Sequence, residues 1–475
     1  MRDAAARRPV YVLGAGFSKA IHRAMPITNE LGEALASRLG SQVSFDLRVG
    51  QSFEDWLTLQ MTPLPFLESY ENATRAAHGA HIVAEIAHVL DETMAVASTS
   101  ECPLWLRQLV ALWHQERAVI LTFNYDTLIE RAVNGNPPTT TSTDGQVHYV
   151  MGDHVVFPAP PAPQAQFLGD MGAGHTDQSF EILKLHGSLA WYWAAGDSSG
   201  STLIRIREKQ VFGSLVPMTP DSDFDGATKL DRYLVPPITS KDGFYSSYLS
   251  HTLWRQARSL VAAASEITLM GYSLPAEDRV ASQLVNQAPK DAKVSVVDRD
   301  PGSAVPPTGI LGNLIQLGIE AESAWSGDNC LSEYVGGRVE KAAASLSVHS
   351  AFGALENRWA DVVVAVPSSQ GIAGSGRLCV IAWNRQESVF ETHSVDSTYI
   401  RGAVMPLREI VFNATPSAYR ELDDFVTAEK LKQLVEGGRE FIFRLSATGE
   451  KAVGVGVERI NVGTWEALQV HWAPL

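Results

Sequence analysis

Short apolar runs alternate with longer segments of helical periodicity over roughly the first 320 residues. The runs lie at residues 9–13, 118–123, 182–185, 266–270 and 294–297, and a glycine or a polar turn follows each of them. Short, nearly continuous apolar runs are typical of parallel strands that are covered on both faces. The pattern therefore predicts one parallel sheet in this part of the chain.

The segments between these runs carry apolar residues at helical spacing. Leu31, Leu35 and Leu39 recur every four residues, and Thr28 or Asn29 can cap the helix that contains them. A repeated strand-then-helix order predicts an α/β fold of the Rossmann type, with a helical insertion. Further helices are predicted within residues 53–117 and over 127–133, 248–264 and 277–286.

Two internal stretches and the C-terminal part of the chain have different patterns. Residues 134–180 and 194–245 are polar or rich in turn residues, and we expect irregular structure with a few short strands there. From about residue 335, apolar or alternating runs surround one acidic helical stretch, Glu421–Glu436, which predicts a smaller C-terminal α+β domain. The expected domains are residues 1–325, with a helical module at about 40–117, and residues 335–475.

Composition narrows the class of protein. Hydrophobic residues make up 45% of the chain, yet no window reaches the roughly 18 uncharged apolar residues that span a bilayer, so we expect no membrane segment. The N-terminus runs straight into a predicted strand, so no signal peptide is expected. The three cysteines are far apart in the sequence, which favours a reducing cytoplasm over a disulfide framework. The net charge of −15 disfavours direct binding of nucleic acid.

Candidate chemistry follows the predicted strands, because ligands of open α/β sheets bind beyond the carboxyl ends of the strands. A glycine turn there lets backbone N–H groups approach a pyrophosphate, and Gly14 and Gly16 suit that role, with the Ser18 hydroxyl as a further donor. His186 titrates near neutrality and could take a proton from a ribose hydroxyl or a water. The segments concerned are Gly14–Ser18, Thr122–Asp126, His186–Ser188, Gly271–Ser273 and Asp298.

Each of these features also has an ordinary structural interpretation. The glycines could form a plain tight turn, and a single histidine is more often bonded to a neighbouring carbonyl. Asn124 and Asp126 could simply form the turn after their strand. Glu54 and Asp55, at the start of a predicted helix, are expected to be solvated or to cap that helix.

The ordered set of motifs resembles the sirtuin catalytic domain, and in detail the bacterial sirtuin-like proteins of antiphage defence. The resemblance covers roughly residues 9–305. It is carried by Met25–Leu31, Asn124–Glu130, Leu185–Ser188 and Gly271–Pro275, together with the Gly14–Ser18 turn.

The resemblance implies that NAD is the substrate and assigns roles to the residues that match. Asn124 would orient the nicotinamide ribose or an attacking water, and His186 would be the general base. Asp126 would accept a hydrogen bond from the nicotinamide carboxamide, and Asp298 could bind the adenosine ribose. The implied NAD-binding residues are Gly14, Ala15, Gly16, Phe17, Ser18, Thr122, Asp126, Gly271, Ser273 and Asp298.

The chain also departs from the deacylases of this family. Those enzymes carry a zinc ribbon made from two cysteine pairs, whereas residues 187–270 contain no cysteine, so no metal site is expected. The stretch that clamps acyl-lysine peptides has no match either, which favours water as the acceptor.

The leading hypothesis is a cytoplasmic NAD hydrolase that forms nicotinamide and ADP-ribose and depletes NAD in antiphage defence. Residues 335–475 would serve oligomerisation or binding of a phage-sensing partner, and the family suggests a translocase ATPase or a short Argonaute. Three alternatives stay open: an ADP-ribosyltransferase, a protein deacylase, and a nucleotide sensor without catalytic activity. A dehydrogenase is disfavoured, because no substrate domain for hydride transfer is recognisable.

Overall fold

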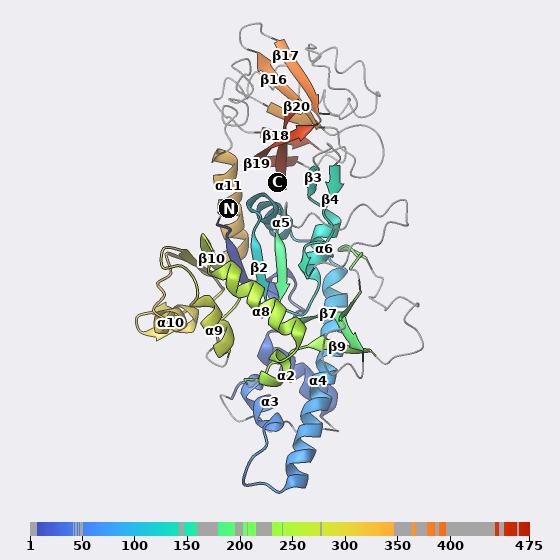
Figure 1. Cartoon of the computed structure of the whole chain (residues 1–475), viewed down its shortest axis with the longest axis vertical. Coiled ribbons are helices and arrows are strands. Elements are labelled where there is room, and N and C mark those ends of the chain that lie inside the picture. The colour runs from blue at the N-terminus through green and yellow to red at the C-terminus, as the bar shows by residue number, and fades with distance from the viewer. Residues whose placement is uncertain are drawn as a thin grey trace. The chain divides into compact units, whose positions relative to one another are not determined.

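The structure is a computed structural model of the whole chain (Figure 1). It describes residues 7–40, 51–141, 147–158, 179–194, 203–206, 208–214, 230–239, 241–275, 278–345, 363–366, 378–384, 389–395, 442–445, 451–462 and 465–475, together with residues 42, 45 and 47. The chain divides into two compact units. The first holds residues 1–106, 116–137 and 150–334, and the second holds 107–115, 138–149 and 335–475.

A seven-stranded sheet forms the centre of the first unit, in the order β14-β11-β10-β1-β2-β6-β5. Every neighbouring pair in it is parallel. The strands are β1 (Val10–Leu13), β2 (Val119–Thr122), β5 (Val156–Phe157), β6 (Glu181–Lys184), β10 (Glu266–Met270), β11 (Lys293–Val297) and β14 (Ser323–Trp325). All residues of β1 and β2 are buried, as expected for strands covered on both faces. The predicted α/β fold class is confirmed.

The connection between the first two strands is helical, as the sequence predicts. After α1 (Ala15–Ile21), the helices α2 (Thr28–Leu39), α3 (Phe53–Met61) and α4 (Ser69–Ser98) pack against one another (Figure 1), and α5 (Leu104–Glu116) leads into β2. The expected caps of α2 are wrong: Ile27 is the N-cap residue, and the Glu30 side chain accepts a hydrogen bond from its N–H. Asn29 instead accepts from the N–H of Phe53, which joins α2 to α3.

Helices also follow the later strands. They are α6 (Leu128–Gly135), α7 (Asp242–Tyr245), α8 (Tyr248–Val261), α9 (Arg279–Val285), α10 (Gly309–Gln316) and α11 (Cys330–Ser345). Three strands after His186 form an antiparallel sheet in the order β8-β7-β9, with β7 (Gly187–Ala194), β8 (Leu203–Arg205) and β9 (Leu230–Leu234). A two-stranded sheet pairs β12 (Ser303–Ala304) with β13 (Pro307–Thr308).

The second unit contains a six-stranded sheet in the order β17-β16-β15-β18-β19-β20. Its strands are β15 (Val363–Val366), β16 (Leu378–Asn384), β17 (Val389–Val395), β18 (Ile442–Leu445), β19 (Lys451–Val462) and β20 (Trp465–Pro474). The hairpin of β3 (Thr139–Thr141) and β4 (Val147–Tyr149) also belongs to this unit. The strands predicted in the tail are present, whereas the helix predicted over 421–436 lies outside the described residues. The predicted domain boundaries stay a prediction. No helix in the described part of the chain is long and apolar enough to cross a membrane.

Candidate active site

A cavity of about 670 Å³ opens where the carboxyl ends of the central strands meet. Within the sheet, β2 lies next to β1 on one side and β10 lies next to it on the other. The cavity therefore lies at the point where the strand order reverses. That is where open α/β sheets bind their ligands, and the volume suits a small-molecule site. Ten of the twelve predicted site residues line it: Gly14, Ala15, Gly16, Ser18, Asn124, Asp126, His186, Gly271, Ser273 and Asp298.

Phe17 and Thr122 do not line the cavity. The Phe17 ring is fully buried and packs edge-on against Trp105, with 5.5 Å between the ring centroids. The Thr122 hydroxyl accepts a hydrogen bond of 3.1 Å from the Asn124 N–H. Both side chains are buried, because the periodicity of α1 and the pleat of β2 point them into the core. They therefore stabilise the turns without facing the cavity.

The glycine turn is shaped by contact with a second turn. Gly271 has a φ of +54°, and a Cβ on it would overlap the backbone of Gly16 and Phe17. A Cβ on Gly14 would come within 2.7 Å of the Gly271 carbonyl oxygen. The N–H of Gly16 donates to that same oxygen, and the N–H of Gly14 donates to the Met270 carbonyl. These two N–H groups are therefore occupied within the protein, and the missing side chains of the glycines let the two turns touch. That the Gly14–Ser18 turn holds a pyrophosphate stays a prediction.

Asn124, Ser18 and Asp126 form one hydrogen-bonded set at the end of β2. The Asn124 Nδ2 donates to the Gly14 carbonyl at 2.8 Å and to the Ser18 hydroxyl at 2.9 Å. That hydroxyl donates to Asp126 Oδ2 at 2.6 Å. With Nδ2 held in this way, the Asn124 Oδ1 is the amide atom that can serve a ligand. The turn-forming interpretation holds in part, since Asp126 Oδ1 also accepts from the Leu128 N–H at the start of α6.

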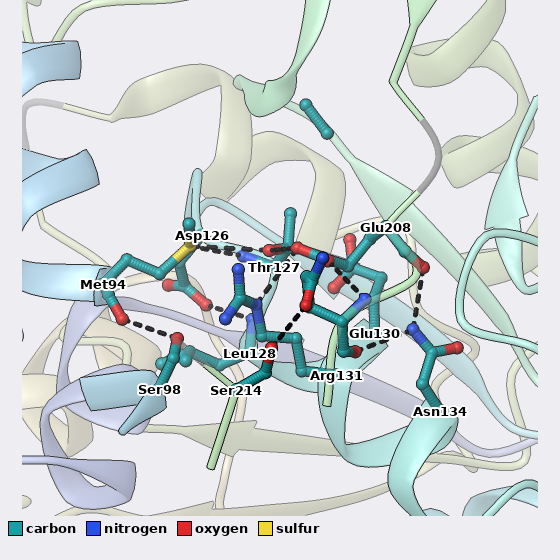
Figure 2. A network of polar contacts seen from close by, with 12 residues as sticks. Met94, Ser98, Asp126, Thr127, Leu128, Glu130, Arg131, Asn134, Glu208 and Ser214 are labelled. Carbon is teal, nitrogen blue, oxygen red and sulfur yellow. Dashed lines mark hydrogen bonds and ion pairs between the residues drawn. The ribbon is translucent and has the colours of Figure 1, made fainter. Parts of the chain in front are cut away.

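Buried charged residues that do not line the cavity contact the turn that carries Asp126, and Figure 2 shows the polar network around this turn. The Lys184 ammonium donates to the Asp126 carbonyl and pairs with Glu130 at 2.9 Å. Arg131 pairs with Glu208 at 3.1 Å, and Thr127 donates to the same carboxylate. Burial raises the pKa of Glu130, an effect that Lys184 opposes. These contacts fix the turn that carries Asn124 and Asp126.

His186 is buried against the edge of the cavity. Its ring packs on Phe123 with 4.9 Å between centroids, and its Nε2 is buried without a hydrogen-bond partner among the described residues. Burial, together with the nearby Lys241 ammonium, lowers the pKa of His186 to about 3. The imidazole is therefore neutral at pH 7. The alternative interpretation, that His186 is bonded to a neighbouring carbonyl, is not supported at Nε2.

Three charged residues beside His186 were not predicted from the sequence as parts of the site. Asp278 Oδ2 lies 3.8 Å from His186 Nε2, and the Lys241 Nζ lies 3.4 Å from both Asp278 Oδ2 and Glu54 Oε1. All three line the cavity. The expectation that Glu54 is solvated or capping is wrong, because its side chain is only 13% exposed and paired. Neither Glu54, at the start of a predicted helix, nor Lys241, in a polar stretch, carries a sequence signal for this pairing.

Asp298 and Ser273 lie along the same cavity. The Asp298 Oδ1 accepts from the Asp300 N–H at 3.0 Å, and burial raises the pKa of Asp298. Arg299, next in sequence, also lines the cavity and lowers that pKa in part. A carboxylate at the end of β11 can accept hydrogen bonds from ribose hydroxyls.

The assembled groups can perform acid–base and positioning chemistry. A neutral buried imidazole, an oriented amide and a hydrogen-bonded carboxylate line one cavity. A reaction that needs a positioned nucleophile requires such an arrangement. In the described part of the chain no three His, Cys, Asp or Glu side chains are grouped so that they could hold a metal ion.

Comparison with known proteins gives structural neighbours only. No protein-family model matches the sequence, and no curated protein matches it. Among solved structures, the chain is similar to Sir2 in complex with a p53 peptide and NAD+, at 14% identity over 71% of this chain and 94% of that chain, with a TM-score of 0.32. It is also similar to a Sir2 homologue in complex with NAD, at 15% identity over 70% of this chain and 90% of that chain, with a TM-score of 0.31. The fold class itself rests on the strand order and pairing given above.

Proposed function

We propose that this protein is an NAD+ hydrolase that cleaves the bond between nicotinamide and ribose. The observation that carries the proposal is that Asn124, Asp126 and a neutral His186 all line one cavity, at the reversal point of the sheet. The resemblance of the Asn124–Glu130 and Leu185–Ser188 motifs to sirtuin-like proteins gives these residues their roles.

In the proposed reaction, water replaces nicotinamide at C1′ of the ribose, and ADP-ribose and one proton are formed. His186 takes the proton from the water or from a ribose hydroxyl, and the Asn124 Oδ1 orients the same group. Asp126 accepts from the nicotinamide carboxamide; its two oxygens already accept from Ser18 and Leu128, and a carboxylate offers about four acceptor positions. The leaving pyridinium is already cationic, so the protein mainly positions the reactants and stabilises positive charge on the ribose.

The proposed biological role is NAD depletion in antiphage defence. It rests on the resemblance to bacterial defence proteins, which also suggests that the chain works in the cytoplasm, as a homo-oligomer or with a phage-sensing partner such as a translocase ATPase or a short Argonaute. The C-terminal unit is the proposed site of that contact. In cells carrying the protein with its partner, NAD should fall after infection, and His186→Ala should prevent the fall.

Nicotinamide release from NAD by the purified protein, alone and with candidate partners, tests the activity. His186→Ala and Asn124→Ala should each lower the rate by about 100-fold or more, while the matched His154→Ala should leave it unchanged, because His154 does not line the cavity. Adenine-labelled NAD separates the alternatives. A transferase leaves label on protein, a deacylase needs an acyl-lysine peptide for turnover, and a sensor binds NAD without releasing nicotinamide. Equal turnover in wild type and His186→Ala would rule out the proposed base.

A further inference from the structure

Two neighbouring helices of the first unit lie in stretches of sequence without carboxylates. Helix α8 leads into β10, and α9 connects β10 with β11, so both connections move in the same direction along the sheet. Right-handed crossovers therefore place both helices on one face of the sheet, where they pack against each other (Figure 1). Residues 243–265 and 279–290, which contain these helices, hold no Asp and no Glu, although the chain as a whole is acidic.

The exposed side of α8 carries one aromatic and three basic side chains. They follow one another at intervals of three, four and three residues, which places them on one side of the helix: Tyr248, His251, Arg255 and Arg258. All four are exposed, Tyr248 to 72%, whereas the opposite side of the helix is buried. The row spans about 15 Å of the helix.

Positive charge continues on α9 and just beyond it. Arg279, the first residue of α9, and Lys290, shortly after its end, are both exposed. Arg7 donates to the carbonyl of Ala264, just after α8, and pairs with Asp291 at 2.6 Å, which brings the neighbouring Lys290 close to the end of α8. We refer to the following six residues as the basic face: Tyr248, His251, Arg255, Arg258, Arg279 and Lys290.

The charges of the basic face have no counter-ions in the structure. No ion pair or side-chain hydrogen bond within the described part of the chain engages its four Arg and Lys side chains. The helix dipole favours a cation in the last turn of α8, which accounts for Arg258. It does not account for Arg255 in the middle of α8 or for Arg279 at the start of α9.

We propose that the basic face binds the phosphate backbone of a nucleic acid. Surfaces that bind nucleic acids are polar and positively charged, whereas protein interfaces are built around an apolar centre. Among the described residues of α8 and α9, Tyr248 and Val280 are the only exposed large hydrophobic side chains, so this face has no such centre. An exposed tyrosine beside arginines can in addition stack on a base of a single strand.

The net charge of −15 argues against nucleic acid for the chain as a whole, and it limits the proposed affinity. At physiological ionic strength, however, charges more than about 8 Å away are largely screened, so the local charge of the basic face decides whether a phosphate backbone binds. We therefore expect binding that is salt-dependent and independent of sequence, with a Kd of about 1–100 µM.

Binding can be measured by fluorescence anisotropy with the full-length protein and labelled oligonucleotides of about 20 nucleotides, as a single strand and as a duplex. Four cations that each neutralise one phosphate predict a slope of log affinity against log salt of about −3 to −4 for the duplex. Tyr248→Ala should weaken binding of the single strand by about fivefold or more and binding of the duplex less.

The decisive variant is Arg255→Gln/Arg258→Gln. It should weaken binding at about 50 mM salt by tenfold or more and reduce the salt slope by about two. The matched control is Lys209→Gln/Lys341→Gln, two exposed lysines on the 208–214 segment and on α11. Each double variant removes two positive charges and changes the net charge from −15 to −17, but the control should bind as the wild type does. All four side chains are exposed, so thermal unfolding should be unchanged.

A loss of affinity in the face variant that the control does not share would support the proposal. No binding of either oligonucleotide up to about 100 µM at about 50 mM salt would overturn it, as would an equal loss in the control. Competition by polyglutamate as strong as that by an unlabelled oligonucleotide of equal charge would also overturn it, in favour of an acidic protein partner. These measurements need no turnover of NAD, so their outcome is independent of the proposed function.

Discussion

The contact between the Gly14–Gly16 turn and Gly271 predicts an unequal cost for two similar substitutions. Gly271 and Gly318 both have positive φ values, +54° and +74°. A Cβ on Gly318 would meet nothing within 4 Å, whereas one on Gly271 would overlap the backbone of Gly16 and Phe17. Gly318→Ala therefore carries only the left-handed strain, about 1–2 kcal/mol. Gly271→Ala adds an overpacking cost of about 1–3 kcal/mol.

The two variants can be compared by urea unfolding followed by tryptophan fluorescence. Gly271→Ala should lower the free energy of unfolding by about 2–5 kcal/mol, and Gly318→Ala by the smaller amount. Gly271→Ala should also weaken nicotinamide release, because displacing the turn moves Asn124, which donates to the Gly14 carbonyl. An equal loss of stability in both variants would show that the two turns do not depend on each other.

Three further predictions follow from the buried polar groups. Ser18→Ala removes the hydroxyl that links Asn124 to Asp126, so nicotinamide release should fall by about tenfold or more. Thermal unfolding should show a stability loss of about 1 kcal/mol. Unchanged turnover would contradict the link. Since the pKa of His186 is about 3 in the folded chain and near 6.5 when unfolded, the unfolded state binds the extra proton between these values. Stability should therefore fall as the pH drops from 6.5 toward 3, by about 1.4 kcal/mol per pH unit more than in His186→Gln; parallel stability curves would refute the low pKa. Lys184→Met leaves the buried Glu130 carboxylate without its ammonium partner, so the free energy of unfolding in urea should fall by about 3–5 kcal/mol. The double variant Lys184→Met/Glu130→Gln should recover part of this loss. No recovery would contradict the pairing.

The sequence was most informative where one local signal decides the structure. The run at 266–270 became β10 with the same bounds, because a short continuous apolar segment has few alternatives beside a buried sheet. Ligands of open α/β sheets bind beyond the carboxyl ends of the strands, and this rule correctly predicted that Asn124, His186 and Gly271 line one cavity. The predicted caps of α2 were wrong because a long-range contact competes with capping: Asn29 bonds the start of α3.

The pairing of Glu54 with Lys241 shows what local patterns cannot reveal. Glu54 and Lys241 are 187 residues apart, and neither stands in a pattern that differs from a solvated surface. Their pairing depends on how α3 and α7 pack, which no short-range periodicity encodes. The partners of the Gly14 and Gly16 N–H groups could not be predicted for a similar reason, since these are the carbonyls of Met270 and Gly271, far away in the sequence.

The most direct measurement of the central claim is a crystal structure of the protein with a non-hydrolysable NAD analogue. The account predicts that the nicotinamide riboside lies in the cavity beyond β1 and β10, with its C1′ within reach of both Asn124 and His186, directly or through one water. An analogue bound elsewhere, or with C1′ beyond the reach of either side chain, would contradict it.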